Sequence, residues 1–137
     1  MSYITQADLA NYIDSQQLIA MTDDLATGVV NQTILGNVLQ MASDKVDSLV
    51  SAIYQVPFAA PVPVKIRTAA AVFAAEMLYN RRLTPTEKNP LTPQADMLRQ
   101  ELMDINRGLL SLDYASRRAF TPIVVGSSYN RANSNIY

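Results

Sequence analysis

The residues best suited to chemistry in this sequence are two arginine pairs and one aspartate pair. Arg81–Arg82 and Arg117–Arg118 could contact phosphate groups, although helix termination and solubility explain the first pair equally well. Asp23–Asp24 lies in the segment TDDLATG, which lacks the alternating oxygen ligands and the closing Glu of a calcium loop. We therefore expect turn and capping roles for the two aspartates.

Histidine and cysteine are both absent from the sequence. Their absence excludes disulfides, the usual zinc sites and acid–base catalysis by histidine. The four glycines are not clustered, so there is no glycine-rich phosphate loop. A pair of carboxylates could still form an active site, but solvated helix faces account for the acidic residues. We predict an interaction or structural protein with no catalytic residue, no cofactor and no metal.

The charge of the chain is unevenly distributed. The net charge is −1, but residues 1–64 contain six acids and one base, whereas residues 65–137 contain six acids and ten bases. One interpretation is chance together with solvated helix faces. The other is that two surfaces of opposite sign meet in neighbouring subunits or partners. The slightly acidic balance disfavours a nucleic-acid footprint over the whole protein.

The element that should position the others is a helix over residues 63–82. Pro63 suits a first helical turn, and a long stretch without Gly or Pro follows it. Apolar residues recur there at steps of four, three and four, which is one face of a helix: Ile66, Ala70, Phe73 and Met77. Alanines surround that face, so other helices can approach closely. We predict a central, buried helix that Arg81–Arg82 closes at the negative end of its dipole.

A second long helix should begin after Asn31, a good N-cap, and run to about Tyr54. Its apolar residues repeat about every 3.5 residues, as in a helix that packs against another helix: Leu35, Leu39, Ala42, Val46, Leu49 and Ile53. Three prolines then break the helix within residues 55–63. We expect Phe58 to attach this short crossing to the core, and the helices on either side to be packed neighbours.

A third, shorter amphipathic helix is predicted after a polar loop. Thr92 can cap it and Pro93 can take its first position, while Gly108 should mark its C-terminal end. Its apolar residues again step by four, three and four: Leu98, Leu102, Ile105 and Leu109.

Two short helices are predicted before residue 30. Thr5 followed by Asp8 is a variant of the capping box and begins the first. Either Asp14 or Ser15 can cap the second.

Together these elements predict an all-α fold: a small helical bundle of three long helices plus short N-terminal helices, in one domain over residues 1–112. Residues 113–137 have a polar composition and low helix propensity, which predicts an extended C-terminal arm. The aromatic residues and the β-branched run of this segment suggest that it lies on another surface. With the two arginine pairs, the candidate interface residues are Arg81, Arg82, Tyr114, Arg117, Arg118, Phe120, Ile123, Val124, Val125, Tyr129, Arg131 and Tyr137.

Neither a membrane span nor a leader is expected from the sequence. No apolar run approaches the roughly 20 residues that cross a bilayer, and the N-terminal segment lacks the basic and apolar regions of a signal peptide. We therefore expect a cytosolic protein at the place of its synthesis, without membrane contact.

The order of these features resembles the Mu-like prophage proteins that are grouped with the head–tail connectors, or adaptors, of tailed phages. In that family a helix with an A-x-x-x-I-D-x-x-L-like pattern ends in a Tyr-x-x-Pro step, and the matching positions are Ala42, Val46, Asp47, Val50, Tyr54 and Pro57. The next helix ends in Leu-Tyr-x-Arg-Arg, matched by Leu78, Tyr79, Arg81 and Arg82. The likeness covers about residues 3–112, although Ile53 stands where the family usually has Arg.

The resemblance implies a small α-helical protein that forms a ring, usually of twelve copies, beneath the portal of a DNA-filled capsid. Such a ring extends the DNA channel, through which DNA only passes, and presents a platform for stopper or tail-terminator proteins. It implies a place in the neck of the virion after assembly in the host cytoplasm, and no catalytic residue. The C-terminal arm of such connectors commonly reaches toward the portal.

Two other functions compete with this one. The chain could be a different helical interaction module, such as a phage regulator or a DNA-binding protein. However, the predicted helix 63–82 has an apolar middle, whereas a recognition helix needs exposed polar residues at successive turns. The third reading is an enzyme, for which the sequence lacks a recognisable nucleophile–base pair.

Overall fold

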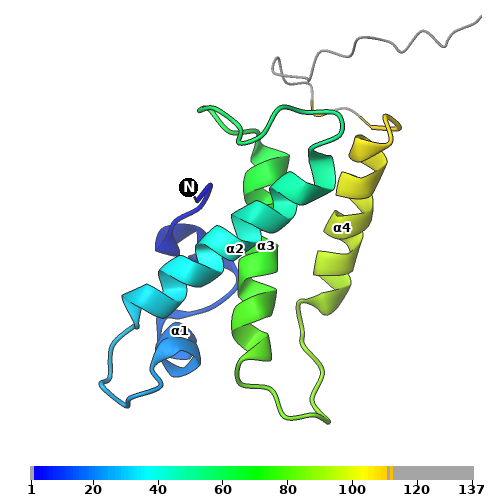
Figure 1. The fold of residues 1–137 in the computed structure, drawn as a ribbon. Coiled ribbons are helices and arrows are strands. Elements are labelled where there is room, and N and C mark those ends of the chain that lie inside the picture. The colour runs from blue at the N-terminus through cyan, green and yellow to red at the C-terminus, as the bar shows by residue number, and fades with distance from the viewer. Residues whose placement is uncertain (1, 111, 113–137) are drawn as a thin grey trace, which may run out of the picture.

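The computed structural model describes residues 2–110 and 112, whose regular elements are all helices (Figure 1). In chain order they are a 3-10 helix η1 (Gln6–Asn11) followed by α1 (Ser15–Thr22), α2 (Gln32–Val50), α3 (Val64–Asn80) and α4 (Thr92–Asn106). The predicted all-α bundle of three long helices after short N-terminal ones is confirmed. The predicted arm, residues 113–137, lies outside the described residues.

Helix α3 is the central element, as its alanine-rich sequence predicts. It packs against α2, α4, η1 and α1, and Figure 1 shows α2 crossing it and α4 running beside it. Ile66, Ala70 and Phe73 of the predicted face are fully buried, whereas Met77 is only half-buried. The surrounding small residues that allow this close approach are also buried: Ala69, Ala71, Ala74 and Ala75.

Phe73 lies where three helices meet. The Nζ atom of Lys45 on α2 is 4.8 Å from the centroid of its ring, and the guanidinium carbon of Arg99 on α4 is 5.5 Å from it. Cations within about 6 Å of an aromatic ring are attracted to its face. Phe73 therefore holds α2 and α4 against α3 by cation–π contacts as well as by buried area.

Helix α2 begins as predicted and ends earlier than predicted. The side-chain oxygen of Asn31 accepts hydrogen bonds from the N–H groups of Thr33 and Ile34, both at 3.1 Å, so Asn31 is the N-cap. The helix ends at Val50 rather than near Tyr54. Of its predicted seam, these residues are buried: Leu35, Leu39, Ala42, Val46 and, beyond the helix, Ile53; Leu49 is half-buried.

Phe58 attaches the α2–α3 crossing to the core, as predicted. Its ring lies 6.0 Å from the rings of both Tyr3 and Tyr54, measured between centroids. The Phe58 N–H donates to the Tyr3 hydroxyl at 2.9 Å, and that hydroxyl donates to the carboxylate of Asp47 on α2. The Tyr3 hydroxyl thereby links the start of the chain both to the α2–α3 crossing and to α2.

The start of α4 corrects one prediction. Thr92 lies inside the helix, and Leu91 stands at the N-cap position without a capping side chain. The turn before the helix is made by Asn89, whose side-chain oxygen accepts from the Leu91 N–H at 2.9 Å and whose carbonyl accepts from the Thr92 N–H at 3.3 Å. Because Asn89 already closes this turn, the Thr92 hydroxyl has no capping role.

The end of α4 confirms one prediction and corrects another. Gly108 has a φ of +81° and follows the last helical turn, as a C-terminal cap should. This left-handed residue takes the chain out of the helix before Leu109, which is 70% exposed rather than part of the apolar stripe. Leu98, Leu102 and Ile105 are buried as predicted.

The short N-terminal helices begin at the predicted caps. The Asp8 carboxylate accepts from the Thr5 N–H at 2.8 Å at the start of η1. The Asp14 carboxylate accepts from the Gln17 N–H at 2.8 Å, so Asp14 rather than Ser15 caps α1. Among the described helices, none is both long enough and apolar enough to cross a bilayer.

Candidate functional site

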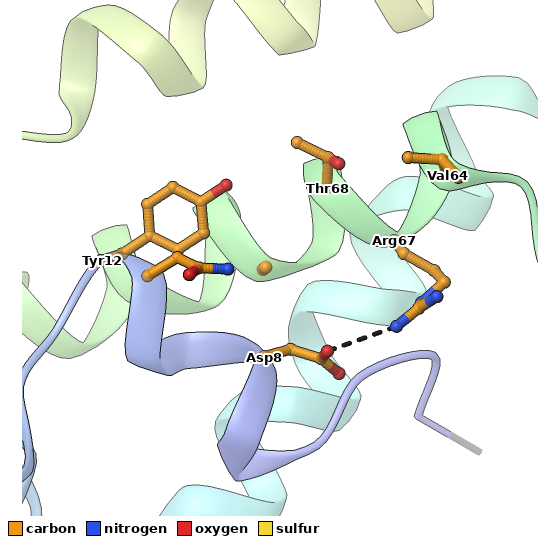
Figure 2. A pocket seen from close by; sticks show the side chains of 7 residues that line it. Asp8, Tyr12, Val64, Arg67 and Thr68 are labelled. Carbon is orange, nitrogen blue, oxygen red and sulfur yellow. Dashed lines mark hydrogen bonds and ion pairs between the residues drawn. The ribbon is translucent and has the colours of Figure 1, made fainter.

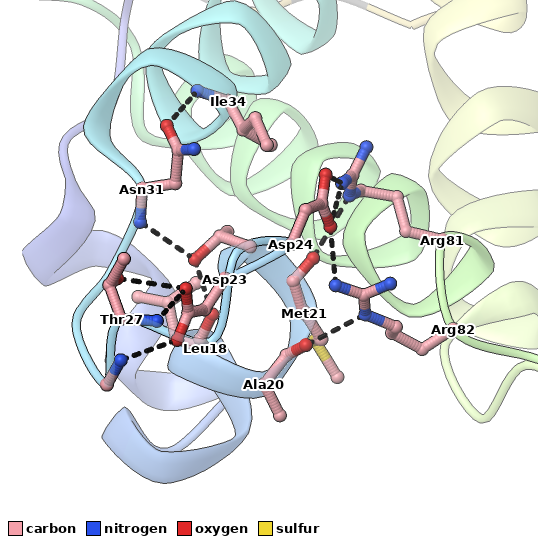
Figure 3. Close-up of polar contacts among 12 residues, drawn as sticks. Leu18, Ala20, Met21, Asp23, Asp24, Thr27, Asn31, Ile34, Arg81 and Arg82 are labelled. Atoms are coloured by element: carbon pink, nitrogen blue, oxygen red, sulfur yellow. Dashed lines mark hydrogen bonds and ion pairs between the residues drawn. The ribbon is translucent and has the colours of Figure 1, made fainter.

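Arg81 and Arg82 are the two predicted interface residues that the structure describes. Their side chains turn from the end of α3 toward the segment between α1 and α2, where both bind the carboxylate of Asp24 (Figure 3). The distance between Arg81 Nη2 and the nearer Asp24 oxygen is 2.7 Å. The two head groups are therefore engaged within the chain, although each side chain keeps some exposed surface.

The same arginines also hold the last turn of α1. Arg81 Nε donates to the carbonyl of Met21 at 3.0 Å, and Arg82 Nε donates to the carbonyl of Ala20 at 2.8 Å. Carbonyls in the last turn of a helix have no partner within it, so the arginines complete α1 rather than only terminating α3. Their hydrogen bonds, that of Arg81 first, lower the pKa of Asp24.

Residues 23–30, here called the α1–α2 loop, are shaped by Asp23. Its carboxylate accepts from the Thr27 N–H at 2.8 Å, the Thr27 hydroxyl at 2.9 Å and the Gly28 N–H at 2.6 Å. These backbone donors lower the pKa of Asp23. Ala26 and Gly28 have φ values of +57° and +82°, a conformation that costs energy for Ala and little for Gly. The predicted turn role of Asp23 is confirmed, whereas the Asp24 carboxylate binds Arg81 and Arg82 of the distant end of α3 instead.

Thr22 joins the two ends of this loop. Its buried hydroxyl donates to the carbonyl of Leu18 at 2.9 Å and accepts from the N–H of Asn31 at 3.1 Å. Asn31 in turn caps α2 (Figure 3). The loop is thus held at both ends and in its middle.

Two large apolar side chains extend outward from this well-held loop. Leu25 is 79% exposed and Val29 is 61% exposed. They were not among the predicted interface residues, because the sequence gives no sign that a loop rich in turn residues is fixed by its own polar groups. The combination of a fixed backbone and exposed apolar side chains is what a protein contact uses at low entropic cost.

A pocket of about 180 Å³ lies between η1 and the first turns of α3. In Figure 2, Asp8 of η1 and Tyr12, just after the end of η1, lie on one side of the pocket. Val64, Arg67 and Thr68 of α3 lie on the other side. Arg67 Nη2 lies 3.3 Å from the Asp8 carboxylate. The lining residues are Asp8, Asn11, Tyr12, Val64, Arg67, Thr68 and Ala71.

The end of the described chain is attached beside the α2–α3 crossing. The side-chain oxygen of Asn106 accepts from the Ala52 N–H at 2.9 Å, and the Leu112 N–H donates to the Tyr54 hydroxyl at 2.9 Å. The other candidate interface residues lie outside the described residues and remain predictions: Tyr114, Arg117, Arg118, Phe120, Ile123, Val124, Val125, Tyr129, Arg131 and Tyr137.

Two acidic residues are partly or largely buried. Burial is the main reason that the pKa of Asp47 is raised, although the hydrogen bond from Tyr3 opposes it, and burial also raises the pKa of the Tyr3 hydroxyl. Glu76 of α3 is buried, and its Oε1 atom lies 3.4 Å from Nη2 of Arg99 on α4. The Glu76 carboxylate joins α3 to α4, and the Asp47 carboxylate joins α2 to the segment before η1. In the described part of the chain no three His, Cys, Asp or Glu residues gather as metal ligands would.

Comparison with known proteins places the chain in a family. No curated protein matches it. The family model described as Bacteriophage Mu, Gp36 matches residues 3–122, which is most of the 137-residue chain. This range includes both sides of the pocket, the α1–α2 loop and all of the described helices. The chain therefore belongs to the bacteriophage Mu Gp36 family.

Proposed function

We propose that this phage protein is a head–tail connector, or adaptor, of the virion neck. In this proposal its copies form a ring, of twelve subunits by resemblance to other connectors, beneath the portal. The ring extends the DNA channel and gives stopper or tail-terminator proteins a platform. Membership of a phage Mu family over most of the chain supports a structural or assembly role, and the role involves no catalytic step.

The observation that carries the proposal is the spread of exposed apolar side chains over separate elements of the bundle. A ring subunit must contact two neighbours as well as proteins above and below it, so it needs several contact surfaces. Large apolar residues are exposed on the α1–α2 loop, on α2, at the start of α3, on α4 and after α4: Leu25, Val29, Met41, Val64, Met97, Leu109 and Leu110.

The arrangement of charge favours a connector over a DNA-binding regulator. Each arginine that the structure describes forms an ion pair within the chain: Arg67, Arg81, Arg82, Arg99 and Arg107. The described body therefore offers little unpaired positive charge to a phosphate backbone. In a gel-shift assay with salt titration we expect no DNA binding at physiological salt, which suits DNA as passing cargo.

Electron microscopy of the full chain, alone and mixed with the purified portal, tests the proposal. We expect rings that stack coaxially on the portal. In a phage with a nonsense mutation in this gene, we expect heads that lack tails and lose their DNA, and restoration by the wild-type protein. Normal virions without the protein, or a protein that binds DNA but not the portal, would contradict the connector role.

A further inference from the structure

We propose that the α1–α2 loop of one copy inserts into the pocket between η1 and α3 of the next copy around the ring. Leu25 enters the pocket, Val29 packs at its rim against Val64, and Asp23 faces Arg67. The inference rests on the proposed ring and names the contact that joins its neighbours.

The loop is ready for such a contact before binding. Its backbone is held by the Asp23 carboxylate, by the pairing of Asp24 with Arg81 and Arg82, and by the Thr22 hydroxyl. Because little further ordering of the loop is needed on association, the loss of loop entropy offsets little of the free energy gained by burying its apolar side chains. A rigid loop that exposes aliphatic side chains is suited to insertion into a cavity.

The pocket has room for one aliphatic side chain of this loop, and its mixed walls offer both polar and apolar contacts. Its volume is about 180 Å³, and a cavity of about 150 Å³ accepts a molecule as large as benzene. A leucine side chain has fewer carbon atoms than benzene, so the pocket has enough volume for Leu25. Val64 at the rim is 75% exposed, and Ala71 and the ring of Tyr12 give the pocket apolar wall area.

The charges at the two surfaces are complementary. Asp23 stays ionised because backbone N–H donors lower its pKa. Across the contact, the Arg67 side chain is 50% exposed and is bound to Asp8 by a single contact of 3.3 Å. A guanidinium has five N–H donors, so donors remain on Arg67 for Asp23 or for a carbonyl of the incoming loop.

The positions of the two surfaces require that a different copy provides each. The loop is fixed to the C-terminal end of α3 by Arg81 and Arg82, whereas the pocket lies along the first turns of α3. A helix of 17 residues is roughly 25 Å long, so a copy cannot fill its own pocket. Contacts between unlike surfaces are head-to-tail, and such contacts form a ring when the rotation from one copy to the next closes.

Disulfide cross-linking tests the contact directly, because the chain contains no cysteine. Val29→Cys and Val64→Cys are combined in one full-length chain, which is assembled on portal-bearing heads and mildly oxidised. We expect a ladder of covalent multimers that extends to the whole ring. Each single variant should give no ladder. A matched control that pairs Val29→Cys with Met97→Cys, an exposed residue on α4, should also give none.

A second variant measures the strength of the contact. Leu25→Asp should leave the melting temperature unchanged, because the side chain is exposed in the single copy. We expect it to raise the protein concentration needed for ring assembly at least about tenfold, whereas Met97→Asp should have little effect.

The two proposals fail in different ways. Rings that form normally with Leu25→Asp, or that cross-link through the control pair and not through the loop–pocket pair, overturn this contact and leave the connector role intact. A protein that forms no ring and does not attach to portal-bearing heads overturns both.

Discussion

Asp24 is the residue at which α1, α3 and the intervening loop are joined, and its charge should matter for stability. Hydrogen bonds from Arg81 and Arg82 lower its folded-state pKa below the ordinary value of 3.8. The stability from such a group is present above the ordinary pKa and is lost as pH falls through the folded pKa. We expect Asp24→Asn to lower the free energy of unfolding at neutral pH, with a difference from wild type that disappears in strong acid. A difference in urea melts that is independent of pH would contradict this.

Asp47 should show the opposite dependence on pH. Burial raises its folded-state pKa above 3.8, so its contribution to stability is present below that value and is lost as pH rises through the folded pKa. Asp47→Asn keeps a side-chain oxygen that can accept the hydrogen bond from the Tyr3 hydroxyl, but it removes the charge. We expect this variant to gain stability relative to wild type as pH rises from acid to neutral, measured by urea unfolding across that range. If the stability of Asp47→Asn relative to wild type fell as pH rose, the ionised carboxylate would be favoured in the folded protein.

Phe73 should be the most costly single residue of the core to truncate. It has no exposed surface, and its ring contacts Lys45 and Arg99 from two other helices. Phe73→Ala should lower the free energy of unfolding by roughly 3–5 kcal/mol. Met77→Ala, on the same helix but half-buried, is the matched control and should cost clearly less. A loss under about 1 kcal/mol for Phe73→Ala would contradict the central place of α3.

At the scale of the helices, two of the predicted N-caps, Asn31 and Thr92, give a direct comparison. Asn31 accepts two backbone hydrogen bonds at the start of α2, whereas Thr92 lies inside α4 and caps nothing. Asn31→Ala should therefore cost about 0.5–2 kcal/mol, and Thr92→Ala should cost much less. Thermal unfolding of both variants measures the difference. Equal losses would mean that the Thr92 hydroxyl stabilises α4 in another way.

Periodicity was sufficient to predict the three long helices. The apolar steps in α2 and α3 reflect local geometry, since residues three and four apart share a helix face whatever the helix packs against. Phe58 could be assigned to the core because it is a large apolar side chain between prolines in a short crossing. Its burial against Tyr3 and Tyr54 agrees with that assignment.

Contacts between distant residues could not be predicted in this way. The pairs of Asp24 with Arg81 and Arg82 join residues 57 and 58 positions apart, and no local pattern connects them. Leu109 fits the apolar stripe by spacing, but the left-handed conformation of Gly108 removes it from the helix. The outward position of Leu25 depends on how Asp23 folds the loop. The proposed loop–pocket contact depends on this loop conformation, so it could not be predicted from the sequence.

At the scale of the whole molecule, part of the uneven charge is neutralised within one chain. Asp8 pairs with Arg67, and Asp24 pairs with Arg81 and Arg82, so acids of the first half meet bases of the second. This intramolecular pairing explains some of the asymmetry without a neighbour. The meeting of opposite charges between neighbouring subunits remains a prediction.

Residues 114–137 should be needed for attachment and not for folding. Among the described residues the buried core extends from Tyr3 to Ile105, and the last described contact joins the Leu112 N–H to the Tyr54 hydroxyl. A chain truncated after Asp113 keeps all of these contacts. We therefore expect its helical content by circular dichroism and its melting temperature to be nearly those of the full chain.

The same truncation should abolish stable attachment to portal-bearing heads. The deleted segment carries four aromatic residues, three arginines and the Ile123–Val125 run, which has strand propensity and could add a strand to an exposed edge of another chain. Co-sedimentation with heads, and electron microscopy of the resulting particles, measure attachment. A chain with residues 114–137 in scrambled order is the matched control, because it keeps length and charge but loses the aromatic spacing and the β-branched run. If the scrambled chain attaches, composition rather than sequence carries the contact. If the truncated chain unfolds, the segment belongs to the core, and if it still attaches normally, the segment has no attachment role.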